Sequence, residues 1–478
     1  MDTKKQAALA AVGNKKELLQ QVADSIWAYA ELSLQEYRSA ALYEQVLEEE
    51  GFTVEKGICG IETAFSASFG SGRPVIGILG EYDALSGLSQ AGYAIKETPL
   101  VPGAPGHGCG HNLLGAGALG AALGVKAYLE ETGGPGTVIF YGCPGEEGGA
   151  AKAFMAREGL WYGLDAALTW HPDDCNEAAA GSSNACIQVQ YLFHGVAAHA
   201  AGSPEKGRSA LDAVTLMNMG VEFLREHMDT KARIHYAITN AGGCSPNVVP
   251  ARASVLYLVR SDKVEKALAL QKRVDTIARA AAMMTETTLE RKFIDGLAEV
   301  VPNAPLEALL HKNFSEQGAP AYTEEELAFA AALEKTFHTE GYVPGAGSCQ
   351  EAYAAAVRGM QKGPMNDFVM PLFTGDAFSP GSTDVGDVSW QCPTAQLHVA
   401  AWPNGCPGHS WQNVSCGKSP LGYKALLKAA QVLCGAAIDL LEQPELLSAA
   451  REEFAARTAG GYHCPIPVEA VPTLPELG

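Results

Sequence analysis

The chain contains 478 residues, which is too long for one compact core and long enough for two or three. Hydrophobic residues make up 47% of it and charged residues 18%, which excludes a disordered or coiled-coil protein and suits a globular enzyme. The formal net charge of −20 argues against a nucleic-acid partner, because an acidic surface repels phosphates.

Neither the start of the chain nor its apolar stretches have the pattern of a membrane element. The longest such stretch, residues 113–125, is shorter than the ~20 residues that a membrane-spanning helix needs. The opening Met-Asp-Thr-Lys-Lys is followed by no apolar signal core. The 12 cysteines are scattered and form no CxxC pair, as in a reducing compartment. We therefore expect a cytoplasmic protein without a membrane partner.

The first part of the chain alternates helical and strand patterns. Apolar residues recur at helical spacing over residues 15–50, and residues 52–69 predict paired strands. A small-residue helix is predicted over 112–131. Three short apolar runs are typical of buried parallel strands: 74–79, 137–141 and 166–170. Charged residues or histidine follow each run, where α/β sheets place their sites.

The pattern changes near Ser182. Residues 185–193 alternate like a half-exposed antiparallel strand, and two helices (209–225, 264–284) and two strands (234–238, 254–259) follow. The helical pattern of the first part returns near Leu297, and the Pro-rich tail after Gly460 predicts a surface strap. We therefore predict an α/β fold, with a catalytic domain made of residues 1–182 and 298–478 around a central mixed sheet flanked by helices. Residues 183–297 would form an inserted α+β lid or dimerisation domain.

Side chains that bind metal or move protons follow successive predicted strands: Cys109 and His111, then Glu146 and Glu147, then His171. Because the fold brings these strand ends together, the set suits two divalent metals with a water between them. One glutamate of the doublet could bind metal while the other accepts a proton. Taken singly, each histidine could equally be structural, and the doublet could cap a helix N-terminus.

Four segments occur in an order that resembles a known family: 106–112 (GHGCGHN), 144–149 (PGEEGG), 170–172 (WHP) and 195–200 (GVAAHA). They are similar to the co-catalytic metallopeptidases, which include aminoacylases, hippurate hydrolases, indole-acetyl-amino-acid hydrolases and glutamate carboxypeptidases. Residues 381–389 and 407–410 resemble the branch that contains the B subunit of p-aminobenzoyl-glutamate hydrolase. The resemblance covers nearly the whole chain.

The resemblance implies a role for each matching residue. Glu146 would be the general base, and later the acid that protonates the leaving amine. His199 would stabilise the oxyanion, in this family often across a dimer interface, so a homodimer is implied. Two divalent metal ions, Zn²⁺ or Mn²⁺, would be bound by Cys109, His111, Glu147, His171 and His409.

Four further residues are candidates for contact with the substrate. Asn247 matches a family position with this role. Arg252, like Arg260, could meet a substrate carboxylate or be an exposed strand charge. Asp384 could line the pocket or cap a helix.

Three residues near Cys109 and His111 in the predicted site have expected roles other than metal binding. Asn112 stands where many relatives have Asp, so a charge is missing and the metal affinity could differ. His107 is interpreted as a loop residue that lines the site. Asp83 resembles the family's acidic residue before the metal site, where it could orient a ligand.

The predicted function is metal-dependent hydrolysis of the amide bond of an N-acyl or N-aroyl amino acid, such as p-aminobenzoyl-glutamate. The resemblance implies that a water between the metals would attack the carbonyl and that Glu146 would carry the proton. A dipeptidase or a general aminoacylase is the alternative within enzymes, and a metal-binding scaffold subunit is the alternative outside them. The sequence leaves open whether a paralogous subunit joins the homodimer.

Overall fold

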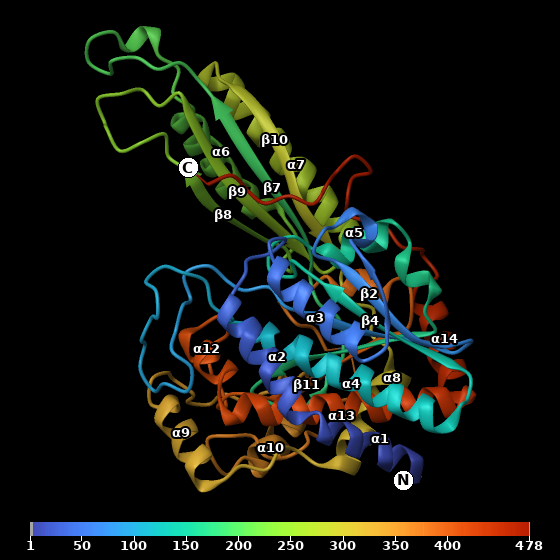
Figure 1. Ribbon diagram of the computed structural model, residues 1–478. Coiled ribbons are helices and arrows are strands. Elements are labelled where there is room, and N and C mark those ends of the chain that lie inside the picture. The colour runs from blue at the N-terminus through green and yellow to red at the C-terminus, as the bar shows by residue number, and fades with distance from the viewer. Residues whose placement is uncertain (1–2, 376, 478) are drawn as a thin grey trace.

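Residues 3–375 and 377–477 are described by the computed structural model, in which the strands form two separate sheets (Figure 1). The larger sheet contains, in spatial order, β1 (Thr53–Lys56), β2 (Phe65–Ser71), β4 (Gly136–Cys143), β3 (Val75–Glu81), β5 (Ala166–Asp173), β11 (Thr394–Ala400) and β6 (Glu177–Ala178). β4, β3, β5 and β11 are parallel to one another, whereas β1, β2 and β6 pair antiparallel with their neighbours. The sheet is therefore mixed, as predicted.

Helices cover this sheet and come from both ends of the chain (Figure 1). The first group is α1 (Thr3–Asn14), α2 (Lys16–Tyr29), α3 (Tyr37–Glu49), α4 (His111–Thr132) and α5 (Ala151–Arg157), with 3₁₀ turns η1 (Ile58–Gly60) and η2 (Leu160–Gly163). The second group is α8 (Ala304–Gln317), α9 (Glu324–Glu334), α10 (Glu351–Met360), α11 (Val385–Ser389), α12 (Trp411–Gly417), α13 (Pro420–Glu442) and α14 (Pro444–Arg457).

The small residues of α4 let it pack tightly between the sheet and α1, α2 and α13. A side chain at Gly117 would overlap Trp170 of β5, and one at Gly124 would overlap Val12 and Cys434. By length and composition α4 could span a membrane, but 89% of its most apolar window is buried inside the protein. It is therefore a core helix, as the small-residue pattern predicts.

The second sheet is antiparallel and projects away from the first (Figure 1). Its spatial order is β10 (Thr288–Leu297), β7 (Ala185–His194), β9 (Arg252–Ser261) and β8 (Arg233–Asn240). Helices α6 (Ala210–Leu224) and α7 (Val264–Thr285) pack on it around a separate hydrophobic core, and short 3₁₀ turns η3 (Pro204–Lys206) and η4 (Arg225–His227) adjoin α6. This is the predicted α+β module, although its limits at residues 183 and 297 stay a prediction.

The C-terminal tail crosses from the catalytic part to the helix-free face of this second sheet (Figure 1). On the catalytic side, the Tyr462 hydroxyl donates to Asp387 at 2.6 Å, and Arg157 donates to the carbonyl of Ala470 at 2.6 Å. On the sheet, the Gln190 amide exchanges two hydrogen bonds with the backbone of Glu476, at 2.7 and 2.9 Å. The tail thus joins the two parts of the molecule, as a strap would.

The predicted helix over residues 15–50 is wrong in one respect, because it is interrupted between α2 and α3. Ala30 closes α2 in the left-handed conformation, with φ of 44°. In the break, the Ser33 hydroxyl donates to Asp83 at 2.8 Å, and Glu36 accepts a hydrogen bond from the backbone of Gly145 at 2.8 Å. Leu32 and Leu34 in this break are only partly buried, whereas Ser33 and Glu36 are buried and support the two loops that follow β3 and β4.

Candidate metal centre

Cys109 and His111 are placed by a tight turn at the start of α4. Gly110 between them has φ of 77°, a conformation that favours glycine. A Cβ atom at Gly110 would come within 3.1 Å of Trp402 and of Pro172, which follows His171. The turn therefore holds the thiol and the imidazole against the end of β5.

Glu146 and Glu147 lie in the loop between β4 and α5. The loop is fixed from behind, because the backbone of Glu147 donates to Asp83 at 2.9 Å and Gly145 donates to Glu36. The side chain of Glu146 is 14% exposed and that of Glu147 10% exposed. Both carboxylates are thus largely removed from water.

His171 is near the end of β5, and His409 lies just before α12. The Nδ1 atom of His171 is 2.7 Å from the carbonyl of Pro172, which leaves Nε2 for another contact. His409 has φ of 54°, uncommon for a residue other than glycine, and its side chain is 56% exposed. Strained backbone at a side chain aimed into a site is typical of functional residues.

The structure brings all five predicted ligands together. The Cys109 Sγ and His171 Nε2 atoms are 3.3 Å apart, and the His409 Nε2 and Glu147 Oε1 atoms 3.5 Å apart. Two groups of donor atoms, each within 4.8 Å of one another, share Cys109: one adds His111 and His171, and the other adds Glu147 and His409. Bonds of about 2.0–2.3 Å from a tetrahedral metal set its ligand atoms about 3.3–3.6 Å apart, so the spacing fits.

Two buried donor atoms in this set lack a hydrogen-bond partner, His111 Nε2 and Glu147 Oε1. The other ring nitrogen of His111 is 2.8 Å from Asp83 Oδ1, which orients the ring so that Nε2 is the nitrogen available to a metal ion. Burial raises the pKa of the Cys109 thiol well above its usual value, so a thiolate here needs a cation beside it. The residues present therefore fit divalent metal ions.

The carboxyl groups around the site differ in charge state. Burial opposes ionisation of Asp83, but hydrogen bonds from His111, the Glu147 backbone and Ser33 hold its pKa at about 2. Asp83 is thus the ligand-orienting anion that the sequence suggests. Burial, and then the charges of Glu81 and Glu147, raise the pKa of Glu146 well above its usual value. Glu146 therefore has the stronger tendency to hold a proton.

Comparison with known proteins agrees with this geometry. A sequence model of the family described as Peptidase dimerisation domain matches residues 181–285. Over 463 residues the chain is 45% identical to the B subunit of p-aminobenzoyl-glutamate hydrolase from Escherichia coli (strain K12), with 95% of each chain covered. The chain belongs to the M20 family of metallohydrolases.

Two further relatives show the breadth of the M20 family. The Xaa-Arg dipeptidase of Mus musculus is 27% identical over 463 residues, covering 94% of this chain and 92% of the relative. A solved dinuclear metal binding peptidase of the M20 family from Bacillus subtilis has the same fold, with a TM-score of 0.54 at 19% identity, covering 90% of this chain and 99% of that one. The chain is therefore an amidohydrolase that depends on metal, and the scaffold alternative is set aside.

Three residues predicted for the site of this M20 enzyme lie far from the predicted metal ligands, at the distal end of the inserted sheet. His199 and Asn247 are in the loops after β7 and before β9, and Arg252 is the first residue of β9. The two loops touch through a bridge between His199 and Val248, and all three predicted side chains are exposed. β7 has 10 residues and so spans about 33 Å. The structure does not bring these residues to the metal centre of their own chain.

Asp384, the last predicted substrate residue, is fully buried. Its Oδ1 atom is 2.5 Å from the Lys152 ammonium group, and its Oδ2 atom accepts from the Lys152 backbone at 3.0 Å. Substrate contact by Asp384 stays a prediction, and this geometry offers no free oxygen for it. Arg260 instead lies at the base of the inserted sheet, donates to Ser382 at 3.1 Å and keeps its Nε atom unpartnered.

His107 and Asn112, on either side of Cys109 and His111, bind backbone carbonyls and belong to none of the donor groups among the described residues. His107 is buried and its Nε2 atom is 2.9 Å from the carbonyl of Ile26; burial lowers its pKa to about 4. Asn112 donates to the carbonyls of Ala23 and Gly417, at 3.3 and 3.0 Å. The amide at position 112 therefore ties α4 to α2 and α12, a structural use that requires no charge.

Three residues beside the site, His398, Glu81 and Lys152, were not predicted from the sequence as site residues. His398 pairs in register with His171 on the adjacent strand, and its Nδ1 atom is 3.2 Å from Asp173. Glu81, at the end of β3, is 3.3 Å from His111 Nε2 and 2.7 Å from Lys152 Nζ. A charged residue at the end of a buried strand was the available signal for Glu81. Nothing local in the sequence indicates Lys152 or His398, because strand order decides their neighbours.

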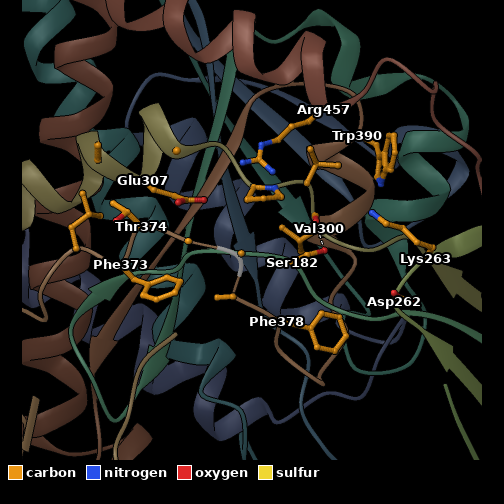
Figure 2. A pocket seen from close by; sticks show the side chains of 18 of the residues that line it. Ser182, Asp262, Lys263, Val300, Glu307, Phe373, Thr374, Phe378, Trp390 and Arg457 are labelled. Carbon is orange, nitrogen blue, oxygen red and sulfur yellow. Dashed lines mark hydrogen bonds between the residues drawn. The ribbon is translucent and has the colours of Figure 1, made fainter. Parts of the chain in front are cut away.

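A cavity of about 790 Å³ lies where the two parts of the molecule meet (Figure 2). Both connecting segments line it, and there the Ser182 hydroxyl donates to the carbonyl of Val300 at 2.7 Å. The rings of Phe373, Phe378 and Trp390 form part of its wall (Figure 2). None of the five predicted metal ligands lines this cavity, so it is separate from the metal centre.

Proposed function

We propose that this M20 enzyme hydrolyses the amide bond of an N-acyl or N-aroyl amino acid, with p-aminobenzoyl-glutamate as the first candidate. The observation that carries the proposal is the arrangement of the glutamate doublet. Glu147 belongs to a donor group with Cys109 and His409, whereas Glu146 is absent from both groups that share Cys109 and is grouped only with Glu81 and His111. One carboxylate is thus available to bind metal and its neighbour to move a proton.

Cys109, His111, Glu147, His171 and His409 would hold two divalent metal ions, Zn²⁺ or Mn²⁺. When bound, such ions supply Lewis acidity for the amide carbonyl and lower the pKa of a water between them. Thiolate and imidazole donors favour Zn²⁺, and the carboxylate also suits Mn²⁺.

Glu146 would accept the proton of the attacking water and return it to the leaving amine. Its largely buried position supports this role, because burial and the neighbouring Glu81 and Glu147 raise its pKa. A carboxyl group with a raised pKa can act as a base and then as an acid in one cycle.

His199 would stabilise the oxyanion in the metal centre of a second copy. Its Nδ1 atom accepts hydrogen bonds from the backbone of Ala201 and Gly202, at 3.2 and 3.0 Å. The neutral ring therefore carries its proton on Nε2, which is exposed and able to donate. Because His199 lies about 33 Å along the sheet from the domain junction, a second chain is the simplest way to bring it to a metal centre.

A homodimer would form through the inserted domain. β8 is an edge strand of the inserted sheet, and Tyr236 and Ile238 on it are 41% and 49% exposed. An unpaired edge strand with apolar side chains is a ready surface for pairing with another copy. The Escherichia coli relative is named as one subunit of its hydrolase, so a paralogous subunit is a further candidate partner. We retain a cytoplasmic location as part of the proposal.

The substrate carboxylates would meet arginine side chains. Arg260 at the base of the inserted sheet has an unpartnered buried Nε atom, which suits a carboxylate bound beside the metal centre. Arg252 and Asn247 lie beside the His199 loop, so they would contact the substrate in the partner's centre together with His199. A glutamate conjugate carries two carboxylates and could use both sets.

A dipeptidase is the second candidate function, since the Mus musculus relative is an Xaa-Arg dipeptidase. The test is a hydrolysis screen of metal-reconstituted protein with p-aminobenzoyl-glutamate, hippurate, N-acetyl amino acids and Xaa-Arg dipeptides. We expect the highest kcat/KM for p-aminobenzoyl-glutamate, and its loss in Glu146→Gln. A preference for the dipeptides would favour the second candidate, and no amide hydrolysis at all would contradict both.

A further inference from the structure

Glu81 reaches the metal centre but is outside the set of five ligands. It is the last residue of β3 and only 2% exposed. Its two carboxylate oxygens have different neighbours: Oε2 is 3.3 Å from His111 Nε2, and Oε1 is 2.7 Å from Lys152 Nζ. Donor atoms of Glu81, His111 and Glu146 all lie within 4.8 Å of one another. The carboxylate thus bridges a buried lysine and the metal-facing nitrogen of His111.

The contact between Glu81 and His111 calls for a cation between them. His111 Nδ1 is 2.8 Å from Asp83 Oδ1, so Nε2 is the ring nitrogen that faces the centre, and it is buried without a hydrogen-bond partner. Nε2 and the Glu81 carboxylate oxygen repel each other at this separation unless a positive charge, either a proton on Nε2 or a metal ion, lies between them. Metal bonds of about 2.0–2.2 Å to nitrogen and oxygen at a tetrahedral angle give a separation of about 3.3 Å.

Lys152 explains why Glu81 has this orientation. The lysine side chain is fully buried in α5, which begins just after the loop of Glu146 and Glu147. Asp384 fixes it twice, through the ammonium group at 2.5 Å and through the backbone at 3.0 Å. A lysine is buried only when its charge is paired, and here the second partner is Glu81 Oε1. With Oε1 so engaged, Oε2 is the oxygen left to face His111.

We propose that Glu81 is a sixth protein donor of the metal centre, binding the metal ion held by His111, and that Lys152 and Asp384 are positioning residues that aim its Oε2 atom. The proposal rests on the proposed function, since it adds to the same centre. It also divides the carboxylates beside His111: Glu81 binds metal, and Glu146 remains free for the proton.

The test measures metal binding rather than activity. Glu81→Gln keeps the size of the side chain but donates poorly to a metal, so the affinity for Zn²⁺ should fall at least about tenfold, the scale seen when metal-site partners are lost. In protein reconstituted with Co²⁺, the visible absorption spectrum should change, because it reports the donors around the ion. A purely structural role for Glu81 would leave that spectrum unchanged.

Lys152→Met alone leaves two buried carboxylates without their cation and could fail to fold. The double variant Glu81→Gln with Lys152→Met removes one charge of each sign and keeps the fold testable by circular dichroism. If Glu81 only neutralised Lys152, the double variant would bind metal like the wild type. We expect it to bind as weakly as Glu81→Gln.

Glu299→Gln is the matched control. Glu299 is 1% exposed, pairs with Lys263 at 3.1 Å and accepts from the Val264 backbone at 3.0 Å, but it belongs to no donor group among the described residues. Its substitution should leave the Zn²⁺ affinity and the Co²⁺ spectrum unchanged. If Glu81→Gln keeps the wild-type affinity and spectrum while His171→Ala has lost metal, Glu81 is not a ligand. The metal centre itself would still stand. Metal retained in His171→Ala as well would instead remove the metal centre and the proposed function.

Discussion

The metal centre and the distal end of the inserted sheet are opposite kinds of environment. At the centre, Asp83, Glu36 and Lys152 hold the donor side chains from behind, and His111 is completely buried. At the distal end, His199 is exposed and its ring is held by two backbone hydrogen bonds from the same loop. All the predicted metal ligands of the first environment come from one chain. In the second environment, His199 can donate a hydrogen bond but has no predicted metal ligand beside it.

This contrast is consistent with the roles proposed for the two sets of residues. Donors that bind metal must be positioned rigidly before the ion arrives, so they belong in a close-packed sheet edge. A donor that stabilises charge only after the substrate binds can sit on a surface that closes later. Substitutions in the two environments should therefore differ in whether they change turnover, metal content or stability.

The Glu146→Gln substitution should have the strongest effect. The amide keeps the shape of the side chain but cannot accept a proton, so turnover should fall by about 10²–10⁴ or more, while metal content and substrate affinity stay near those of the wild type. Its matched control is Glu147→Gln, which should lose metal and recover part of its activity when metal is added. If Glu146→Gln loses metal and Glu147→Gln keeps it, the two roles are reversed. If Glu146→Gln stays fully active, the proposed mechanism is wrong.

His199→Ala should lower turnover by about 10²–10³, the effect of losing one oxyanion donor, and leave the metal content unchanged. If His199 acts on the partner's centre, mixing His199→Ala with Glu146→Ala chains should restore activity, because each hybrid has one intact site. Equal mixing with free exchange of subunits predicts about a quarter of the wild-type activity in a closed dimer. No recovery despite proven exchange would show that the cross-subunit role is wrong.

Loss of a metal ligand should be visible by elemental analysis before any assay. His171→Ala and His409→Ala should each contain less transition metal than the wild type, which we expect to hold up to two ions per chain. His227→Ala, an exposed histidine outside every donor group of the described residues, is the control and should keep the wild-type content. Full metal content in both ligand variants would rule out the assignment.

The weakest effect is expected where the C-terminal tail meets the inserted sheet. Gln190→Ala removes the two hydrogen bonds to Glu476 and a third to the Thr239 hydroxyl, so the free energy of unfolding should fall by about 1–3 kcal/mol. Gln188→Ala, on the same face of β7, is the control, because within the described residues its side chain does not bond to the tail. Urea denaturation of both variants measures the difference. Equal losses would show that the tail adds no stability at this point.

Local sequence patterns were enough for most of the fold. The apolar runs at 74–79, 137–141 and 166–170 are β3, β4 and β5, and the alternating run at 185–193 is β7. These elements are predictable because burial on one or both faces dictates side-chain type residue by residue. The interruption between α2 and α3 was not predictable, since Ser33 and Glu36 leave the helix to bind Asp83 and the Gly145 backbone, residues that are distant in the chain.

The order of residues along the chain was sufficient to establish the chemical inventory: a thiol, imidazoles and a glutamate doublet at the ends of buried strands, in motifs that resemble one family. The contacts between these side chains could be seen only in the folded structure. The fold placed Glu81 between Lys152 and His111, and it put Asp384 against Lys152 with both oxygens occupied. It also set His199 at the far end of the inserted sheet. The type of each residue and the spacing of apolar residues along a helix or strand can be read from the chain. The neighbours of each buried charged group depend on the order of the strands and the placement of the domains.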